Sequence, residues 1–187
     1  MHILIIDTET TGLPKRGAVH SNTSAFDGCR LVQIAWEKYN ISGSLVSSYC
    51  KIVRPEGYTI PLASTNIHGI TTADAIVNGI PLSTVLDDIE NNIEDVGVIV
   101  AHNVEFDESV IMSEMFRNKR YKLLSKWQGL AKECTMKLCA LPDQKWPRLA
   151  EAHLQCFGSL PQGQLHRADK DVSVCASIYW YLSKLRS

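Results

Sequence analysis

Two acidic residues, two positions apart, follow an apolar run near the N-terminus. Asp7 and Glu9 come after residues 3–6, four consecutive apolar residues that are typical of a strand buried on both faces. In an extended chain this spacing places both carboxylates on one face, with Cα atoms roughly 7 Å apart. Two adjacent carboxylates repel each other and are costly to bury without a cation. The pair therefore indicates a divalent-metal site, unless both acids simply cap a strand end in solvent.

Two further acids lie on the apolar faces of predicted helices. Asp107 shares an i, i+4, i+8 face with Ile111 and Met115. Asp171 begins an apolar face that continues through Val174, Cys175, Ile178, Leu182 and Leu185. Acids on a core-facing stripe are seldom unpaired, and neither stripe carries a basic residue. Oxygen-only ligands favour Mg²⁺ or Mn²⁺, and four acids can hold two such ions roughly 4 Å apart, which suits in-line displacement at phosphorus.

A histidine stands five residues before the last of these acids. His166 lies at the predicted start of the final helix, close in sequence to Asp171. Histidine titrates near neutral pH and can take a proton from an attacking water molecule. A lone histidine also often has only a structural role. Its proximity to a core-facing acid favours the catalytic interpretation.

These side chains must be positioned by a mixed set of strands and helices. Hydrophobic periodicity, glycines and prolines predict strands at residues 3–6, 31–41, 45–53 and 96–101 and helices at about 81–93, 103–120, 148–157 and 168–185, with a short apolar element at 135–141 and a long surface loop at 14–29. An initial hairpin followed by alternating helices and strands predicts one α/β domain with a mixed sheet, spanning residues 1–187.

Composition describes an ordinary globular chain with no bulk preference for a charged partner. The chain has 187 residues, 45% of them apolar, and a formal net charge of −1, so a polyanion would have to be held by local patches or metals. No window approaches 18 apolar residues, and no basic segment leads into an apolar one at the start. We therefore expect an intracellular, cytoplasmic protein that does not interact with membranes.

Two local clusters leave alternatives open. Cys134, Cys139, His153 and Cys156 resemble a zinc quartet, although reduced cysteines within apolar segments also pack as small hydrophobic residues. The basic residues Arg117, Lys119, Arg120, Lys122 and Lys126 form either a solvated helix end or a contact for a polyanion.

Three segments resemble the exonuclease motifs of the DnaQ-like (DEDDh) 3′–5′ exonucleases, the superfamily that includes RNase T and the proofreading exonucleases. They are Asp7-Thr8-Glu9-Thr10-Thr11-Gly12-Leu13, then His102-Asn103-x-x-Phe106-Asp107, then His166-x-Ala168-x-x-Asp171. Residues 66–71 are similar to the segment that commonly links the first two motifs. Any single motif is weak, but the three occur in the family's order and extend the similarity over about residues 3–185.

The resemblance implies a fold, a reaction and roles for individual residues. It implies an RNase H-like fold with a five-stranded mixed sheet flanked by helices, and metal-dependent removal of nucleotides from a 3′ end as nucleoside 5′-monophosphates. Transferred position by position, it implies that two Mg²⁺ or Mn²⁺ ions are bound by Asp7, Glu9, Asp107 and Asp171, and that His166 is the general base. It implies a pocket for the terminal nucleotide formed by Thr10, Thr11, Gly12 and Leu13, with Phe106 against the sugar or base. It also implies that His102 and Asn103 are further substrate-binding residues. The length of the 14–29 loop leaves open how a substrate enters beside the first motif.

The leading functional hypothesis is a 3′–5′ exonuclease on single-stranded or frayed DNA, with a proofreading or repair role. The same metal site would serve an exoribonuclease on RNA ends, and no residue decides how the pocket treats a 2′-OH. A different class of protein, a non-catalytic module that binds DNA or a polymerase, should lack at least one of the acids. No polymerase or helicase region accompanies the motifs, so we expect the domain to act alone or with a polymerase bound non-covalently.

Overall fold

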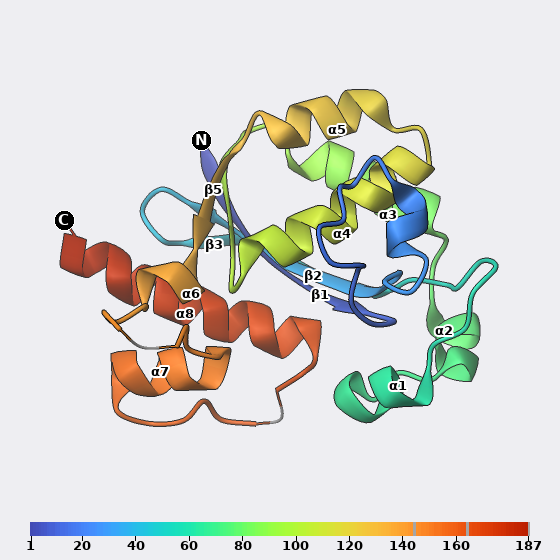
Figure 1. Ribbon diagram of the computed structural model, residues 1–187. Helices are drawn as coiled ribbons and strands as arrows, with labels where there is room; N and C mark the ends of the chain where they lie inside the picture. Colours follow the sequence, from blue (N-terminus) through green and yellow to red (C-terminus); the bar gives the residue numbers. More distant parts are fainter. Residues whose placement is uncertain (144, 164, 187) are drawn as a thin grey trace.

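The computed structural model describes residues 1–143, 145–163 and 165–186 and contains a mixed five-stranded sheet with helices on both faces (Figure 1). The strands are β1 (His2–Thr10), β2 (Leu31–Asn40), β3 (Leu45–Ile52), β4 (Val96–Ala101) and β5 (Ala131–Cys134), in the spatial order β3-β2-β1-β4-β5. The first three strands pair antiparallel, whereas β4 is parallel to both β1 and β5. The mixed sheet is confirmed, as is the number of five strands that the family resemblance implies, although the sequence patterns predicted only the first four of them.

The helices agree with the strongest sequence patterns and add several short elements. They are α1 (Leu62–His68), α2 (Thr72–Asn78), α3 (Leu82–Asn92), α4 (Val104–Arg117), α5 (Tyr121–Gln128), α6 (Thr135–Leu138), α7 (Leu149–Phe157) and α8 (Ala168–Arg186), with a 3₁₀ turn at Thr23–Phe26. The helix predicted for residues 103–120 is too long, because α4 ends at Arg117 and Lys119 takes a left-handed φ of 57°. Strand β5 and helix α5 were not predicted.

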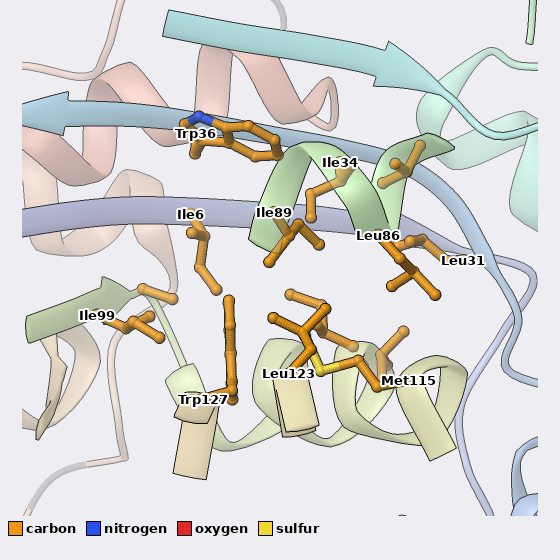
Figure 2. Packing of buried hydrophobic residues seen from close by; sticks show 14 of the residues in the cluster. Ile6, Leu31, Ile34, Trp36, Leu86, Ile89, Ile99, Met115, Leu123 and Trp127 are labelled. Carbon is orange, nitrogen blue, oxygen red and sulfur yellow. The ribbon is translucent and has the colours of Figure 1, made fainter. Parts of the chain in front are cut away.

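The core forms two layers, one on each face of the sheet. On one face, Ile6 of β1 and Trp36 of β2 pack with Ile89 of α3 and Met115 of α4 (Figure 2). On the other face, odd-numbered residues of β1 such as Ile3 pack against α8. Alternate residues of β1 therefore face different helices, and this alternation decides where its acids point.

Two predictions about exposure need correction. Leu185 was placed on the buried face of the last helix, but it is 68% exposed because α8 runs past the edge of its neighbours there. Residues 14–29 do form a loop, yet the loop is anchored by Phe26 and Cys29, which are completely buried. The buried carboxylate of Glu114 on α4 pairs with Arg30 at the end of this loop, with an Nε–Oε1 distance of 2.7 Å.

Three of the five residues in the basic cluster, which begins at the last residue of α4, form ion pairs with neighbouring acids. Arg117 pairs with Asp27, Arg120 with Asp87, and Lys126 with Glu94. This pairing favours the solvated-helix interpretation over a polyanion contact. Within the described residues, none of the helices combines the length and the apolar character that a membrane crossing requires.

Candidate active site

Strand β1 carries the first two acids within its length. The apolar run alone suggested that the strand ends before Asp7. In the structure the strand extends to Thr10, so Asp7 and Glu9 are part of it. Their partners on the neighbouring strand β2 are Ala35, opposite Asp7, and Gln33, opposite Glu9. Both are odd-numbered positions, so their side chains lie on the face that α8 covers. Glu9 is only 9% exposed.

Helix α8 brings a third carboxylate to this pair. One carboxylate oxygen from each of Asp7, Glu9 and Asp171 lies within 4.8 Å of the others. Asp171 also accepts hydrogen bonds from the backbone N–H of His166, at 3.1 and 3.3 Å from its two oxygens. The final acid and the histidine of the third motif are thus directly connected.

The fourth predicted acid approaches from the opposite face of the sheet. Asp107 lies in the first turn of α4 and is 3% exposed. Strand β1 pairs with β4 only as far as Ile5, so the chain after β4 can enter α4 beside the acidic part of β1. Asp107 is not part of the group of three carboxylates; its Oδ1 accepts a 2.7 Å hydrogen bond from the hydroxyl of Thr8. No role was assigned to Thr8 from the sequence. A polar residue within a buried strand could have indicated one.

Burial raises the pKa values of all four acids. Burial raises the pKa of Asp7 well above its ordinary value, and the charges of Asp107, Asp171 and Glu9 raise it further. Burial, followed by the charges of Asp171 and Asp107, raises the pKa of Glu9 to about 8. Burial raises the pKa of Asp107 to about 7, against the opposing effect of hydrogen bonds from Thr8. Burial also raises the pKa of Asp171, while the His166 N–H opposes the rise.

A divalent cation fits this donor set. Within the described part of the chain, the four acids take part in no ion pair with lysine or arginine. The three gathered groups, Asp7, Glu9 and Asp171, offer only carboxylate oxygens, which are the ligands of hard cations such as Mg²⁺ and Mn²⁺. A bound cation would remove the repulsion that raises their pKa values.

The general-base candidate lies at the surface of this cluster. His166 precedes α8 by two residues and has a left-handed φ of 67°. Its side chain is exposed, while its backbone is fixed by Asp171. The ring is therefore accessible to water and to a substrate.

The segment predicted to hold the terminal nucleotide is anchored by backbone contacts. Thr11 is buried; its hydroxyl donates to the carbonyl of Gly28, and its carbonyl accepts from Ser64 of α1. A Cβ at Gly12 would lie 2.8 Å from the Gly28 oxygen, so this position requires glycine. Leu13, in contrast, is 78% exposed. The hydroxyl of Thr10, the first residue of the segment, donates to the carbonyl of Gly12.

The second motif contributes fewer free groups than predicted. Both ring nitrogens of His102 lie at hydrogen-bonding distance from protein groups, Nδ1 at 2.9 Å from the Thr135 hydroxyl and Nε2 at 3.0 Å from the Pro147 carbonyl. Burial lowers its pKa. His102 therefore joins β4 to the segments around residues 135 and 147, and these contacts favour a structural role over the predicted contact with substrate. Asn103 takes a left-handed φ of 75° at the start of α4, and Phe106 packs, partly buried, against the core.

The zinc alternative is not supported by the described residues. Cys139 and Cys156 are neighbours, with their sulfurs 3.9 Å apart. The His153 ring, however, lies 2.7 Å from the Ser159 carbonyl. Among the residues that the structure describes, only the acidic group of three meets the geometry of a metal site.

Comparison with known proteins is consistent with this geometry. The profile of the RNase T exonuclease family matches residues 4–179. The chain belongs to this exonuclease family. No curated protein sequence matches the chain significantly.

Solved structures show the same fold for this exonuclease-family chain. An Escherichia coli exonuclease I complex with single-stranded DNA and bound zinc superposes with a TM-score of 0.74 at 19% identity, and its complex with a dA16 oligonucleotide with 0.74 at 20%. A moderately thermophilic exonuclease I from Methylocaldum szegediense gives 0.74 at 17%. Each match covers 100% of this chain but 41% of the other, so the chain spans about two fifths of the length of these exonucleases.

Proposed function

We propose that this protein is a divalent-metal-dependent 3′–5′ exonuclease that removes nucleotides from single-stranded or frayed DNA. The observation that carries the proposal is the group of Asp7, Glu9 and Asp171, brought within 4.8 Å of one another in an exonuclease-family fold. Asp107 completes the set from the opposite face, where Thr8 holds its carboxylate. These four acids are the proposed ligands of two Mg²⁺ or Mn²⁺ ions.

The proposed reaction adds water to the terminal phosphate and breaks its bond to the 3′ oxygen of the preceding nucleotide. Bound divalent cations would supply positive charge to the phosphate and the leaving oxygen. His166 takes the proton from the attacking water, and Asp171 holds the His166 backbone in place. The products are a nucleoside 5′-monophosphate and a strand shorter by one nucleotide.

The proposed pocket for the terminal nucleotide follows directly after the acids on β1. The fixed backbone of Thr11 and Gly12 supports its floor, and exposed Leu13 offers an apolar surface to a base or sugar. Phe106 lies one residue before Asp107 and is the proposed contact on the α4 side. His102 and Asn103 act indirectly in this proposal, by shaping the start of α4.

Single-stranded DNA is the proposed substrate because the structurally similar exonuclease I complexes contain single-stranded DNA. RNA is the competing substrate, because the metal site acts on the phosphate in either case. A polymerase bound non-covalently, in proofreading or repair, is the proposed protein partner.

A direct comparison of substrates tests the proposal. The purified protein is incubated with 5′-labelled single-stranded DNA, duplex DNA or RNA, in Mg²⁺, Mn²⁺ or EDTA. We expect a ladder that shortens from the 3′ end in either metal but not in EDTA, and faster on single-stranded DNA. Faster shortening of RNA would reassign the substrate, and no shortening of any strand would reject the proposed activity.

A further inference from the structure

A buried glutamine lies beside the acidic cluster, on the strand next to β1. Gln33 of β2 is the partner of Glu9 of β1 in the antiparallel register. Its side chain is 5% exposed. Burying an amide is unfavourable unless its carbonyl and its N–H groups find hydrogen-bond partners. The contacts of Gln33 therefore show which parts of the fold this residue holds together.

The amide of Gln33 joins three elements. Its Oε1 accepts a 3.1 Å hydrogen bond from the backbone N–H of Ala168, the first residue of α8. Its Nε2 lies 3.4 Å from the sulfur of Cys50 on β3. The first N–H groups of a helix have no partner within the helix, so Gln33 supplies from the sheet a cap that the helix itself lacks.

The helix start that Gln33 holds also carries the third motif. Asp171 lies one turn after Ala168, with its carboxylate beside Asp7 and Glu9. His166 lies two residues before Ala168 and donates its backbone N–H to Asp171. A shift at Ala168 would therefore displace the metal ligand and the proposed general base together.

We propose that Gln33 is a positioning residue for the metal site. By fixing the first turn of α8 to β2 beside Glu9, it sets how closely Asp171 approaches Asp7 and Glu9. This inference rests on the proposed function, since it assigns Gln33 a task at the same site.

The rest of α8 stays docked without this hydrogen bond. Val172, Cys175 and Tyr179 are buried against β1 and neighbouring strands, where they pack with Ile3 and Ile5. Loss of the Gln33 amide should therefore misalign the first turn and leave the helix in place. Displacement of a reacting group by about 1 Å can lower a rate by roughly 10²-fold.

The test compares Gln33→Met, which keeps the length of the side chain but has no strong acceptor, with Tyr49→Phe. Tyr49 of β3 donates its hydroxyl to Asp88, away from the acids, so this control loses a hydrogen bond in the same sheet. For Gln33→Met we expect a roughly 10- to 100-fold lower kcat. We also expect a higher Mg²⁺ concentration at half-maximal activity and a smaller rise of Tm on adding Mg²⁺. Tyr49→Phe should keep all three values near wild type.

A second variant separates positioning from a general loss of stability. Gln33→Glu keeps an acceptor for the Ala168 N–H and should recover most of the kcat at saturating Mg²⁺, which offsets its added charge. Equal loss in the Met and Glu variants, or no change in the Gln33→Met values, would overturn the inference. The Mg²⁺-induced rise of Tm tests it independently, because that rise is measured without turnover. An inactive wild type whose Tm responds to Mg²⁺ more than that of Gln33→Met would reject the proposed activity but support the role of Gln33.

Discussion

At the scale of single residues, the site consists of carboxylates that are unfavourable in the metal-free fold. Burial and mutual repulsion raise the pKa values of Asp7, Glu9, Asp107 and Asp171. Buried carboxylates that repel one another destabilise a fold, so their presence here indicates a functional role. Loss of one acid should therefore affect catalysis and stability in opposite directions.

Asp171→Asn tests this opposition. Replacement of the carboxylate by a neutral amide removes a proposed metal ligand and one source of repulsion, so hydrolysis should fall below detection while the Tm in EDTA stays equal or rises. The matched control is Asp169→Asn on the same helix, whose carboxylate pairs with Arg167. The control should retain activity within a few-fold. An active Asp171→Asn protein, or one that no longer folds, would contradict the assigned role.

His166→Ala tests the proposed base. Loss of a positioned base typically lowers a rate by about 10²–10⁴-fold, and we expect a loss in this range, because a water molecule would lack an acceptor for its proton. The ring is exposed, so the Tm should change little. Added imidazole should restore part of the rate. The control is His153→Ala, which removes a ring that contacts the Ser159 carbonyl and lies outside the proposed site. A wild-type rate for His166→Ala would assign the role of base to another group.

At the scale of secondary-structure elements, periodicity predicted the long elements well. Helix α3 lies within the predicted range of 81–93 and buries Leu82, Val85, Leu86 and Ile89, and α8 begins at the predicted residue 168. Strand β5 was missed because it has four residues, two of them Lys132 and Glu133, and it is held in place by pairing with β4. Such a strand is formed by tertiary pairing, which local sequence does not encode.

The sequence predicted the candidate site only where the spacing of residues along a strand or helix determines on which face of that element a side chain lies. Period two in β1 placed Asp7 and Glu9 together, and helical spacing turned Asp107 inward, 3% exposed. The contacts of Thr8 and Gln33 join residues 99 and 135 positions apart, and only the folded chain shows them. His102 was assigned by resemblance, whereas its burial beside Thr135 depends on segments distant in sequence.

His102→Ala tests whether His102 serves the fold or contacts the substrate. Loss of the contacts to Thr135 and Pro147 leaves polar groups unpaired, so we expect unfolding to become easier by about 1–3 kcal/mol. The KM for single-stranded DNA should change little at a temperature where the variant is folded. Chemical denaturation and steady-state kinetics measure the two effects. A large rise in KM with unchanged stability would restore the substrate-binding assignment.

At the scale of the whole molecule, proton binding links the stability of the fold to metal binding. The folded-state pKa of Glu9 is about 8 and that of Asp107 about 7, both above ordinary carboxyl values near 4. The folded state thus binds protons more tightly than the unfolded state. The stability from this source is fully present below about pH 4 and is lost as the pH rises through 7 and 8.

Metal-free protein should therefore have a Tm that falls between pH 6 and pH 8.5, and Mg²⁺ should reverse much of the fall. Mg²⁺ binds carboxylates in their deprotonated form, so binding at pH 7 should release protons and tighten as the pH rises. Calorimetric titrations in two buffers of different ionisation enthalpy measure the number released. Binding without proton release at pH 7 would contradict the raised pKa values.

Asp7, Glu9 and Asp171 form the proposed metal site of a 3′–5′ exonuclease. The most direct measurement follows a 5′-labelled single-stranded oligonucleotide with wild-type protein and with Asp7→Asn, each in Mg²⁺ and in EDTA. We expect a ladder that shortens from the 3′ end for wild-type protein in Mg²⁺ and intact strands in the other three reactions. Shortening by Asp7→Asn, or by the wild type in EDTA, would contradict the assignment of this metal site.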